Sequence, residues 1–491
     1  MRVALVCVIC LLSLTGALAA NANTPSGFIS HPVADTIKRP SKGRLPHDTT
    51  GHPLVVNRIL IMGNRITKEQ IILRELTVKP GDVVNSAELP ILLDLDRKKL
   101  INTRLFNTAD IKVLDYSNGT IDLLIDVNER WYTFPSPIFE LADRNFNEWW
   151  ENYNHDFNRV NYGLRLYQFN MRGRNETLRF TAQFGFQRRF EISYRFPYID
   201  KKQKQGLTFD FDFAETKNLA YQTLDHKLDY LEADNLLRVT RGGGVTYTYR
   251  KSFYTSHSLR YEFRSTSITD TVALLNPNYL GNARLDARYS TLSYSFTNDH
   301  RDYIGYPLTG HYLLVQFTQY GLTSGDDIHK TEGSATFAGY FNLGNNFYLS
   351  NSTTGYLSAQ TTLPYVVNGG LGYQRRIIRG YEIYVIEGQN YLLNKTTFKK
   401  RIFSRVYNVN AMPIRQFRHL PLSVYIKTYG DLGYVKNYSN YEISSRMANK
   451  LLIGAGGGID IVASYDAVLR LEYSFNGEGE NGFFFHIKKE F

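Results

Sequence analysis

Cysteine is nearly absent from this chain of 491 residues, and its position decides what the scarcity means. The two cysteines, Cys7 and Cys10, both lie in an apolar segment at the N-terminus. If that segment is cleaved, the mature chain has no thiol, which excludes disulfide bonds and any metal or redox site that depends on cysteine. A lipid anchor on Cys10 is disfavoured because the apolar residues continue beyond it.

Long hydrophobic runs are missing as well. The N-terminal run, Val3 to Leu14, follows Arg2 and precedes Ala17-Leu18-Ala19, a small-residue cleavage pattern. It is shorter than the ~20 residues that a transmembrane helix needs. Residues 1–20 are therefore predicted to be a secretory signal peptide rather than an anchor helix. With no other run approaching that length, the sequence argues against a membrane protein built from helices.

Aromatic residues, by contrast, are abundant: 36 Tyr and 30 Phe make up most of an aromatic content of 14%. Such residues favour pleated strands, and Tyr also gathers at membrane–water boundaries. The net charge of +11 does not indicate nucleic acid, because a secreted chain rarely meets it and no basic helix is present. The composition suits an outer-membrane β-barrel facing a lipid bilayer, with a secreted β-sandwich as the alternative.

The segment before the strands divides into two parts. Residues 21–53 are rich in Pro, Ser, Asn and Gly and are predicted to be a flexible leader without a convincing helix. Residues 54–130 are predicted to form a small α+β domain of order β-α-α-β-β, with two helices on a three-stranded sheet. In this domain, Thr67 with Gln70 three residues later predicts the start of the first helix.

Residues 131–491 are predicted to consist of strands of about ten residues with alternating faces. Near the C-terminus, apolar Leu469, Leu471 and Tyr473 alternate with polar Arg470 and Glu472. The fold class is therefore mainly β: a transmembrane antiparallel barrel that follows one small α+β domain. The terminal Phe491 is typical of a C-terminal barrel signal.

Several motifs resemble those of the BamA/TamA superfamily of outer-membrane assembly factors. They are Asn298-Asp299-His300-Arg301-Asp302, Tyr306-Pro307-Leu308-Thr309-Gly310 and, most specifically, Ile378-Arg379-Gly380-Tyr381. Residues 54–130 resemble a single POTRA (polypeptide-transport-associated) domain. The resemblance implies a barrel of about 16 strands, whose sixth extracellular loop carries Arg379 and folds back inside. It also implies that five strands follow this loop, and the pattern predicts five.

The resemblance and the strand pattern together predict a lumen site. An Arg in a partly dry lumen needs a carboxylate with bidentate geometry. Asp431, in Tyr429-Gly430-Asp431-Leu432-Gly433, matches the family's acidic strand segment and is predicted to pair with Arg379. Gly380 allows close backbone approach, and Tyr381 is expected to pack against the inner wall. The family's second carboxylate is missing from residues 394–401, so Glu382 or Glu387 is considered as its substitute.

Catalytic signals are poor. The chain has no GxSxG, HExxH or P-loop motif, and glycine-rich residues 454–458 lie in a strand pattern with no helix after them. Glycine pairs in such strands are also considered as a means of softening the pairing near a barrel seam. We therefore expect no enzymatic activity, no cofactor and no metal site.

The leading function is assembly, insertion or translocation of polypeptides at the bacterial outer membrane, with the POTRA domain in the periplasm. The partners expected are the lipid bilayer, unfolded or secreted clients, and the machinery that inserts the barrel itself. Clients are expected to add as strands to the edge formed by Ala109, Ile111, Val113 and Asp115. Three alternatives stay open: a dedicated two-partner secretion pore, a passive porin-like channel and a lipid-handling protein.

Overall fold

The computed structural model describes residues 51–491, apart from residue 118 and residues 142–148, 150–153, 374–375, 410–411, 413–415, 417, 439–444, 464–465 and 490–491. The predicted signal peptide, most of the predicted leader and Phe491 lie outside the described residues. Two structural regions follow one another along the described chain: a small α+β domain and a large antiparallel sheet.

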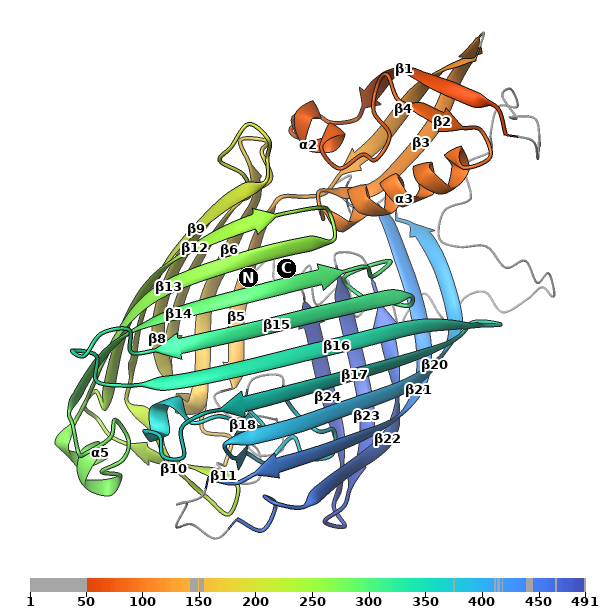
Figure 1. Ribbon diagram of the computed structural model, residues 1–491. Helices are drawn as coiled ribbons and strands as arrows, with labels where there is room; N and C mark the ends of the chain where they lie inside the picture. Colours follow the sequence, from red (N-terminus) through yellow and green to blue (C-terminus); the bar gives the residue numbers. More distant parts are fainter. Residues whose placement is uncertain are drawn as a thin grey trace. The chain divides into compact units, whose positions relative to one another are not determined.

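The small domain contains the two predicted helices and four strands, one strand more than the sequence predicted. Its elements are β1 (Pro53–Met62), α2 (Glu69–Leu73), β2 (Val83–Asn85), α3 (Leu89–Asn102), β3 (Phe106–Ser117) and β4 (Thr120–Glu129). They form a four-stranded sheet of order β2-β1-β4-β3, in which β1 and β4 run parallel (Figure 1). The expectation of three strands was wrong because β2 has only three residues, too few to show a periodic pattern.

The core of this domain follows the predicted alternation. Ile121, Leu123, Ile125 and Val127 point to one face of β4 and are all buried. The predicted helix start is wrong in detail, because α2 begins at Glu69 with Lys68 as its N-cap. Thr67 instead donates its hydroxyl to the buried carboxylate of Glu129, at 2.6 Å. A long-range partner thus replaces the local capping box.

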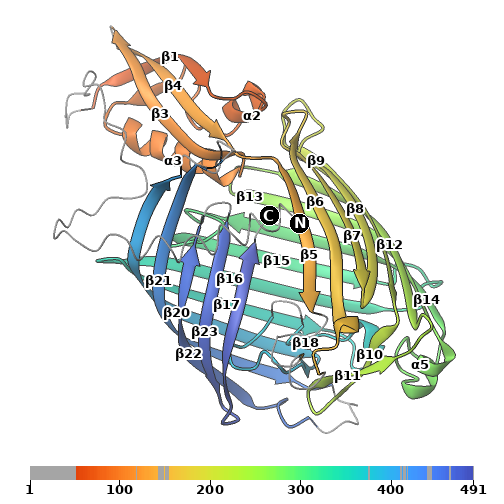
Figure 2. The same cartoon turned by 180° about the vertical axis from the view of Figure 1, so that it is seen from behind.

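The large sheet contains sixteen strands, all antiparallel to their neighbours (Figures 1 and 2). They are β5 (Thr133–Leu141), β6 (Val160–Met171), β7 (Glu176–Gly185), β8 (Gln187–Phe196), β9 (Gln205–Thr216), β12 (Arg238–Arg250), β13 (Thr255–Ile268), β14 (Asp286–Asp299), β15 (Gly310–Tyr320), β16 (Lys330–Gly344), β17 (Phe347–Ser358), β20 (Asn390–Asn408), β21 (His419–Lys436), β22 (Leu451–Val462), β23 (Ala467–Asn476) and β24 (Asn481–Lys489). The fold class and the five strands after the sixth loop are confirmed.

Short elements lie in the connections at one end of the strands of this sheet. A hairpin is formed by β10 (Asn218–Leu224) and β11 (Lys227–Glu232), and a two-residue pair by β18 (Gly370–Leu371) and β19 (Ile386–Glu387). The helix α5 (Asp270–Leu275) and two 3-10 turns, Phe157–Arg159 and Tyr365–Val367, complete the described elements. In the described part of the chain, no helix is long and apolar enough to cross a membrane.

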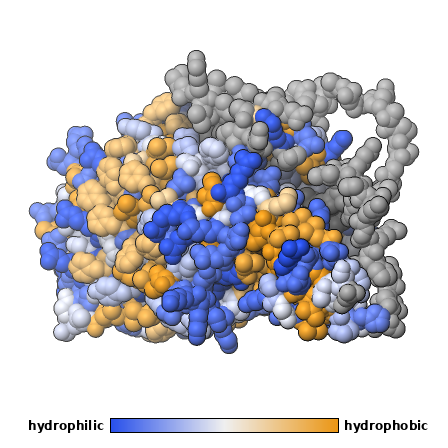
Figure 3. Space-filling model, turned by 90° about the horizontal axis from the view of Figure 1, so that it is seen from above, coloured by the Kyte–Doolittle hydropathy of each residue, from blue (hydrophilic) through white to orange (hydrophobic). Residues whose placement is uncertain are grey.

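The sheet has an apolar outer face and a polar inner face, as strand β21 illustrates. Ile426 and Leu432 are 50% and 45% exposed, whereas Lys427 and Asp431, on the opposite face, are 3% and 0% exposed. Figure 3, seen from above, shows orange apolar patches beside blue polar ones on the surface of the molecule. A soluble sandwich places its apolar face inside, so this reversal identifies a membrane barrel with a polar lumen.

The order of the elements assigns the two ends of the barrel. Strand β5 starts directly after the α+β domain, so the end at Thr133 faces the periplasm and the end at Leu141 faces outward. The extracellular loops therefore include residues 217–237, 269–285, 321–329, 359–389 and 437–450. The first and last strands, β5 and β24, end the sheet, and the described residues record no pairing between them.

Candidate functional site

The sixth extracellular loop, residues 359–389, carries the predicted motif into the barrel. At its tip, Ile378 and Tyr381 are 1% and 2% exposed, although they belong to a loop. The Tyr381 hydroxyl accepts a hydrogen bond from the backbone N–H of Gly477 at 3.0 Å. The tip is therefore packed against the inner wall near β22 and β23.

The structure brings Arg379 and Asp431 together in a bidentate ion pair. Nε and one terminal nitrogen of Arg379 donate to the two carboxylate oxygens of Asp431, at 2.9 and 2.5 Å. The backbone N–H of Arg379 donates to the same carboxylate at 3.0 Å. Asp431 is fully buried, so this geometry compensates for the removal of both charges from water.

Further contacts surround the Arg379 guanidinium. It lies 3.8 Å from the centroid of the Tyr429 ring, a cation–π contact. A terminal nitrogen also donates to Thr397 Oγ1 at 3.1 Å. The guanidinium is thus held by strands β20 and β21 at once.

The second carboxylate comes from Glu472 on β23, whose oxygen lies 3.7 Å from Arg379. Glu382 and Glu387, which the sequence left open for this role, have other partners. Glu382 accepts from the Gly380 backbone at 2.7 Å, and Glu387 accepts from Thr223 at 3.1 Å. The alternation of β23 already placed Glu472 on the polar face, but only the sheet register shows that it reaches the loop.

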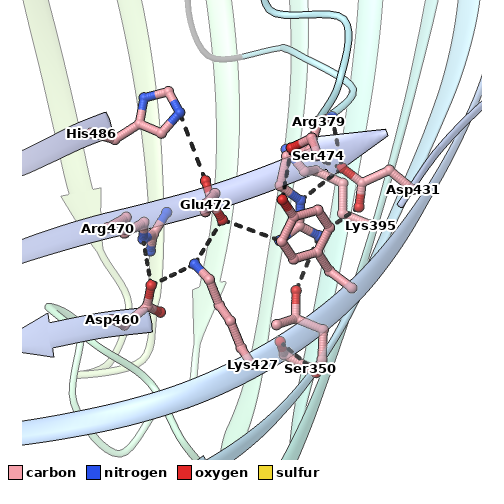
Figure 4. A network of polar contacts seen from close by, with 12 residues as sticks. Ser350, Arg379, Lys395, Lys427, Asp431, Asp460, Arg470, Glu472, Ser474 and His486 are labelled. Carbon is pink, nitrogen blue, oxygen red and sulfur yellow. Dashed lines mark hydrogen bonds and ion pairs between the residues drawn. The ribbon is translucent and has the colours of Figure 1, made fainter. Parts of the chain in front are cut away.

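A network of buried charges extends from this pair along the inner wall (Figure 4). Lys427 lies between Asp460 and Glu472, at 2.5 and 2.7 Å, and all three side chains are at most 4% exposed. Tyr306, from the predicted Tyr306–Gly310 motif, donates its hydroxyl to Asp460 at 2.8 Å. The sequence analysis did not assign Lys427, Asp460 or Tyr306 to this site.

Glycines on the wall make room for the loop. A Cβ added at Gly454 would lie 1.9 Å from the carbonyl oxygen of Arg379, so any side chain there would displace the loop tip. Gly380 has φ +94°, a conformation that favours glycine. The glycines of β22 are not at the seam itself, because β22 lies between β21 and β23 inside the sheet. Gly454 instead forms the part of the wall against which the loop tip rests.

The predicted client edge lies in the small α+β domain. It belongs to β3, one of the two edge strands of the four-stranded sheet, and consists of Ala109, Ile111, Val113 and Asp115. Among the residues that the structure describes, no group of His, Cys, Asp and Glu side chains has the arrangement of a metal site. The lumen network consists of mutually compensating charges, which suits the anchoring of a loop.

Family models match both regions of the chain. A model described as the Omp85 superfamily domain matches residues 170–491, which include the sixth loop and more than half of the chain. The chain belongs to the Omp85 superfamily. A POTRA model, described as a surface antigen variable number repeat, matches residues 54–130. This Omp85 protein is thus an outer-membrane transporter with its POTRA domain in the periplasm.

Two solved structures of CdiB share this fold at low sequence identity. CdiB from Escherichia coli is 11% identical, with a TM-score of 0.55 over 88% of this chain and 76% of that chain. CdiB from Acinetobacter baumannii is 14% identical, with a TM-score of 0.50 over 88% and 73%. BamA from Haemophilus ducreyi lacking POTRA domains 1–3 is 14% identical, with a TM-score of 0.49 over 88% and 84%. A comparison with curated protein sequences finds no match.

Proposed function

We propose that this Omp85 protein assembles client polypeptides into the outer membrane. The POTRA edge strand would capture an extended client segment, and the seam between β5 and β24 would release it sideways into lipid. The observation that carries the proposal is the seam, because β5 pairs only with β6 and β24 only with β23 among the described residues, and no pairing joins β5 to β24.

The sequence of β5 supports a weak seam. Pro135 and Pro137 pair opposite Leu166 and Leu164 of β6, within a continuous ladder of nine residue pairs. Proline has no N–H to donate and is tolerated in a sheet where that side of the strand faces an edge. Since both prolines share one alternation phase, they remove two successive donors from the side facing β24. The seam therefore lacks hydrogen bonds that an ordinary first strand would offer.

The lengths of the strands also support lateral release of the client between β5 and β24. The end strands β5 and β24 have nine residues each, whereas β20 has nineteen. Nine residues are at the lower limit of what a tilted strand needs to cross the hydrocarbon core, ~9–11 residues. A short apolar band thins the adjacent bilayer, which lowers the cost of inserting a new strand there.

The POTRA sheet offers a complementary capture site. Strand β3, with Ala109, Ile111, Val113 and Asp115, is bonded to β4 on one side and ends the sheet on the other. A client strand added there would bind mainly through its backbone, which tolerates varied client sequences. Because the edge needs only an extended segment, one domain can serve many clients.

Depletion followed by quantitative proteomics of the outer membrane tests the proposal. We expect many barrel proteins to decrease together, and a wild-type copy supplied in trans to restore them. A decrease of one exported protein, with the other barrels unchanged, would instead identify a dedicated secretion pore and contradict the proposal.

A further inference from the structure

Two arginines lie on the outer face of the barrel near its extracellular rim. Arg241 of β12 shares the outward face with Val245 and Tyr247, which are 40% and 38% exposed. Arg288 of β14 lies two residues after the strand begins, and both arginines are exposed. The sheet register joins them through Ser265 of β13, which is opposite Arg241 on one side and Arg288 on the other.

This register places the arginines two strands apart in one outward row. Neighbouring strands are ~4.8 Å apart, so the two backbones are separated by roughly 10 Å. Extended Arg side chains can converge over that distance on one ligand between them. The row lies near the extracellular ends of β12, β13 and β14, the strand ends that lie toward the label of α5 in Figure 1.

A hollow of about 500 Å³ lies beside this row, lined by both arginines, Ser265 and the next outward row. That next row consists of Phe211, Gly243 and Phe263, which are paired across β9, β12 and β13. Phe211 and Phe263 are 51% and 46% exposed. Gly243 leaves space between the two rings, and a Cβ added there would meet nothing closer than 3.5 Å. The glycine is therefore not required by the packing of the barrel wall.

Nearby carboxylates form ion pairs with other arginines. Glu215 pairs with Arg188 at 2.8 Å, and Asp327, which also accepts from the Arg288 backbone N–H at 2.8 Å, pairs with Arg284. Within the described ranges, neither Arg241 nor Arg288 forms an ion pair, and the Arg241 guanidinium lies 5.9 Å from the centroid of the Phe213 ring. A cation on the lipid-facing surface is costly at mid-bilayer and cheap at the interface, where an anionic headgroup can approach it.

We propose that this row binds a phosphate of lipopolysaccharide in the outer leaflet, with an acyl chain in the hollow over Gly243. Guanidinium groups bind phosphate oxygens in a bidentate manner, which accounts for two arginines in one row. The rings of Phe211 and Phe263, with Gly243 between them, offer an apolar surface on the side of the arginines that faces the membrane core. The ligand is thus a phosphorylated lipid, held at its headgroup and at the start of one chain.

The test titrates the full-length protein, purified in detergent, with diphosphorylated lipid A and follows bound lipid by native mass spectrometry. We expect the double variant Arg241→Gln/Arg288→Gln to bind at least about tenfold more weakly than wild type. Arg405→Gln, which removes an exposed arginine near the periplasmic end of β20, is the matched control and should bind as wild type does. Heat-modifiability on gels verifies that each variant forms a barrel.

Three further arms make the result decisive. Dephosphorylated lipid A should bind the wild-type protein as weakly as lipid A binds the double variant. Gly243→Leu, which fills the hollow and keeps both charges, should also weaken binding. The proposal is overturned if the double variant binds as tightly as wild type, if both lipids bind equally, or if equimolar inorganic phosphate displaces the lipid.

Discussion

At the scale of single residues, Arg379 combines a charge with a shape that lysine cannot reproduce. Arg379→Ala leaves Asp431 buried without its bidentate partner, a change that costs about 3–5 kcal/mol in comparable buried pairs. Arg379→Lys keeps the positive charge but loses the two parallel N–H donors of the guanidinium. We therefore expect it to keep only part of the stability that Arg379→Ala loses. The temperature at which the folded barrel band disappears from gels measures both variants. Arg405→Ala should leave this temperature unchanged, and an equally stable Arg379→Ala would refute the assignment.

The glycines of β22 provide a second prediction at this scale. Gly454→Ala places a methyl group 1.9 Å from the Arg379 carbonyl, whereas the same change at Gly457 meets nothing closer than 3.5 Å. Overpacking of this kind costs about 1–3 kcal/mol. We expect Gly454→Ala to expose residues 371–386 to proteases added from outside, and Gly457→Ala to leave them protected. Equal protection in the two variants would contradict the close packing of the loop tip on Gly454.

Local motifs predicted some residues of the lumen site and not others. Arg379 and Asp431 were predicted because each lies in a recognisable local pattern. Glu472 was known only as a polar-face residue, since alternation gives the direction of a side chain but not its neighbours on other strands. The register of β22 and β23, which pairs Gly458 with Glu472, fixes that neighbourhood and depends on the whole sheet.

At the scale of elements, strand β5 gives a test of the seam. Replacing Pro135 and Pro137 with valine restores two N–H donors on the side facing β24. At ~0.5–1.5 kcal/mol for each hydrogen bond, we expect a barrel more stable by about 1–3 kcal/mol and slower in client assembly. Midpoints of urea unfolding and rates of client insertion in reconstituted vesicles measure the two effects. Pro421→Val in β21 is the control, and faster insertion by the β5 variant would count against a lateral exit.

The β10–β11 hairpin gives a prediction about pH. His226 at its turn accepts from the Met447 N–H through Nε2, at 3.1 Å, while Nδ1 lies 3.2 Å from the Val385 carbonyl. Burial lowers the pKa of His226 below 6.5 and Arg446 adds to this, against opposing contributions from the Val385 carbonyl, Asp225 and Glu387. The neutral ring therefore stabilises the loops above pH 6.5, and this stability is lost as the pH falls through the lowered pKa.

Hydrogen exchange of the Met447 amide measures that effect. We expect exchange beyond the intrinsic pH dependence to increase below pH 6.5, because a protonated ring cannot accept from Met447. His226→Gln, which does not titrate, should show no such increase. The same increase in this variant would assign the pH dependence to another group.

Elements also mark the limit of the sequence pattern in the POTRA domain. The long alternation of β4 was recognised correctly, but β2 has three residues and pairs with the start of β1. So short a strand exists because its neighbours supply its hydrogen bonds, which no local pattern encodes. The helix start at Thr67 failed for a related reason, since Glu129, distant in sequence, takes its hydroxyl.

At the scale of the whole molecule, the alternating strands predicted a two-faced sheet but not which face meets water. That distinction required the exposed apolar and buried charged residues of the folded barrel. The extracellular end adds a feature the sequence did not reveal. Five loops contribute to one apolar core, which includes Leu219, Val272, Ile328, Val367 and Tyr438. These loops are therefore packed together rather than independent.

This apolar core predicts low resting conductance in planar bilayers. Val272 and Leu274 lie on the same helix, α5, but are 0% and 80% exposed. We expect Val272→Asp to loosen the loops and raise the conductance severalfold, because it buries a charge in the core, and Leu274→Asp to have no effect. Large, steady conductance of the wild-type protein would favour a passive channel instead.

The strand partners of Arg379 share one further property: Thr397, Tyr429, Asp431 and Glu472 all come later in the chain. The sixth loop consequently cannot reach its resting place until the strands up to β23 are in position. A polypeptide truncated before that point would keep an unsecured loop, open to proteolysis. Burial of Arg379 thus requires that the chain has been synthesised and folded at least as far as β23.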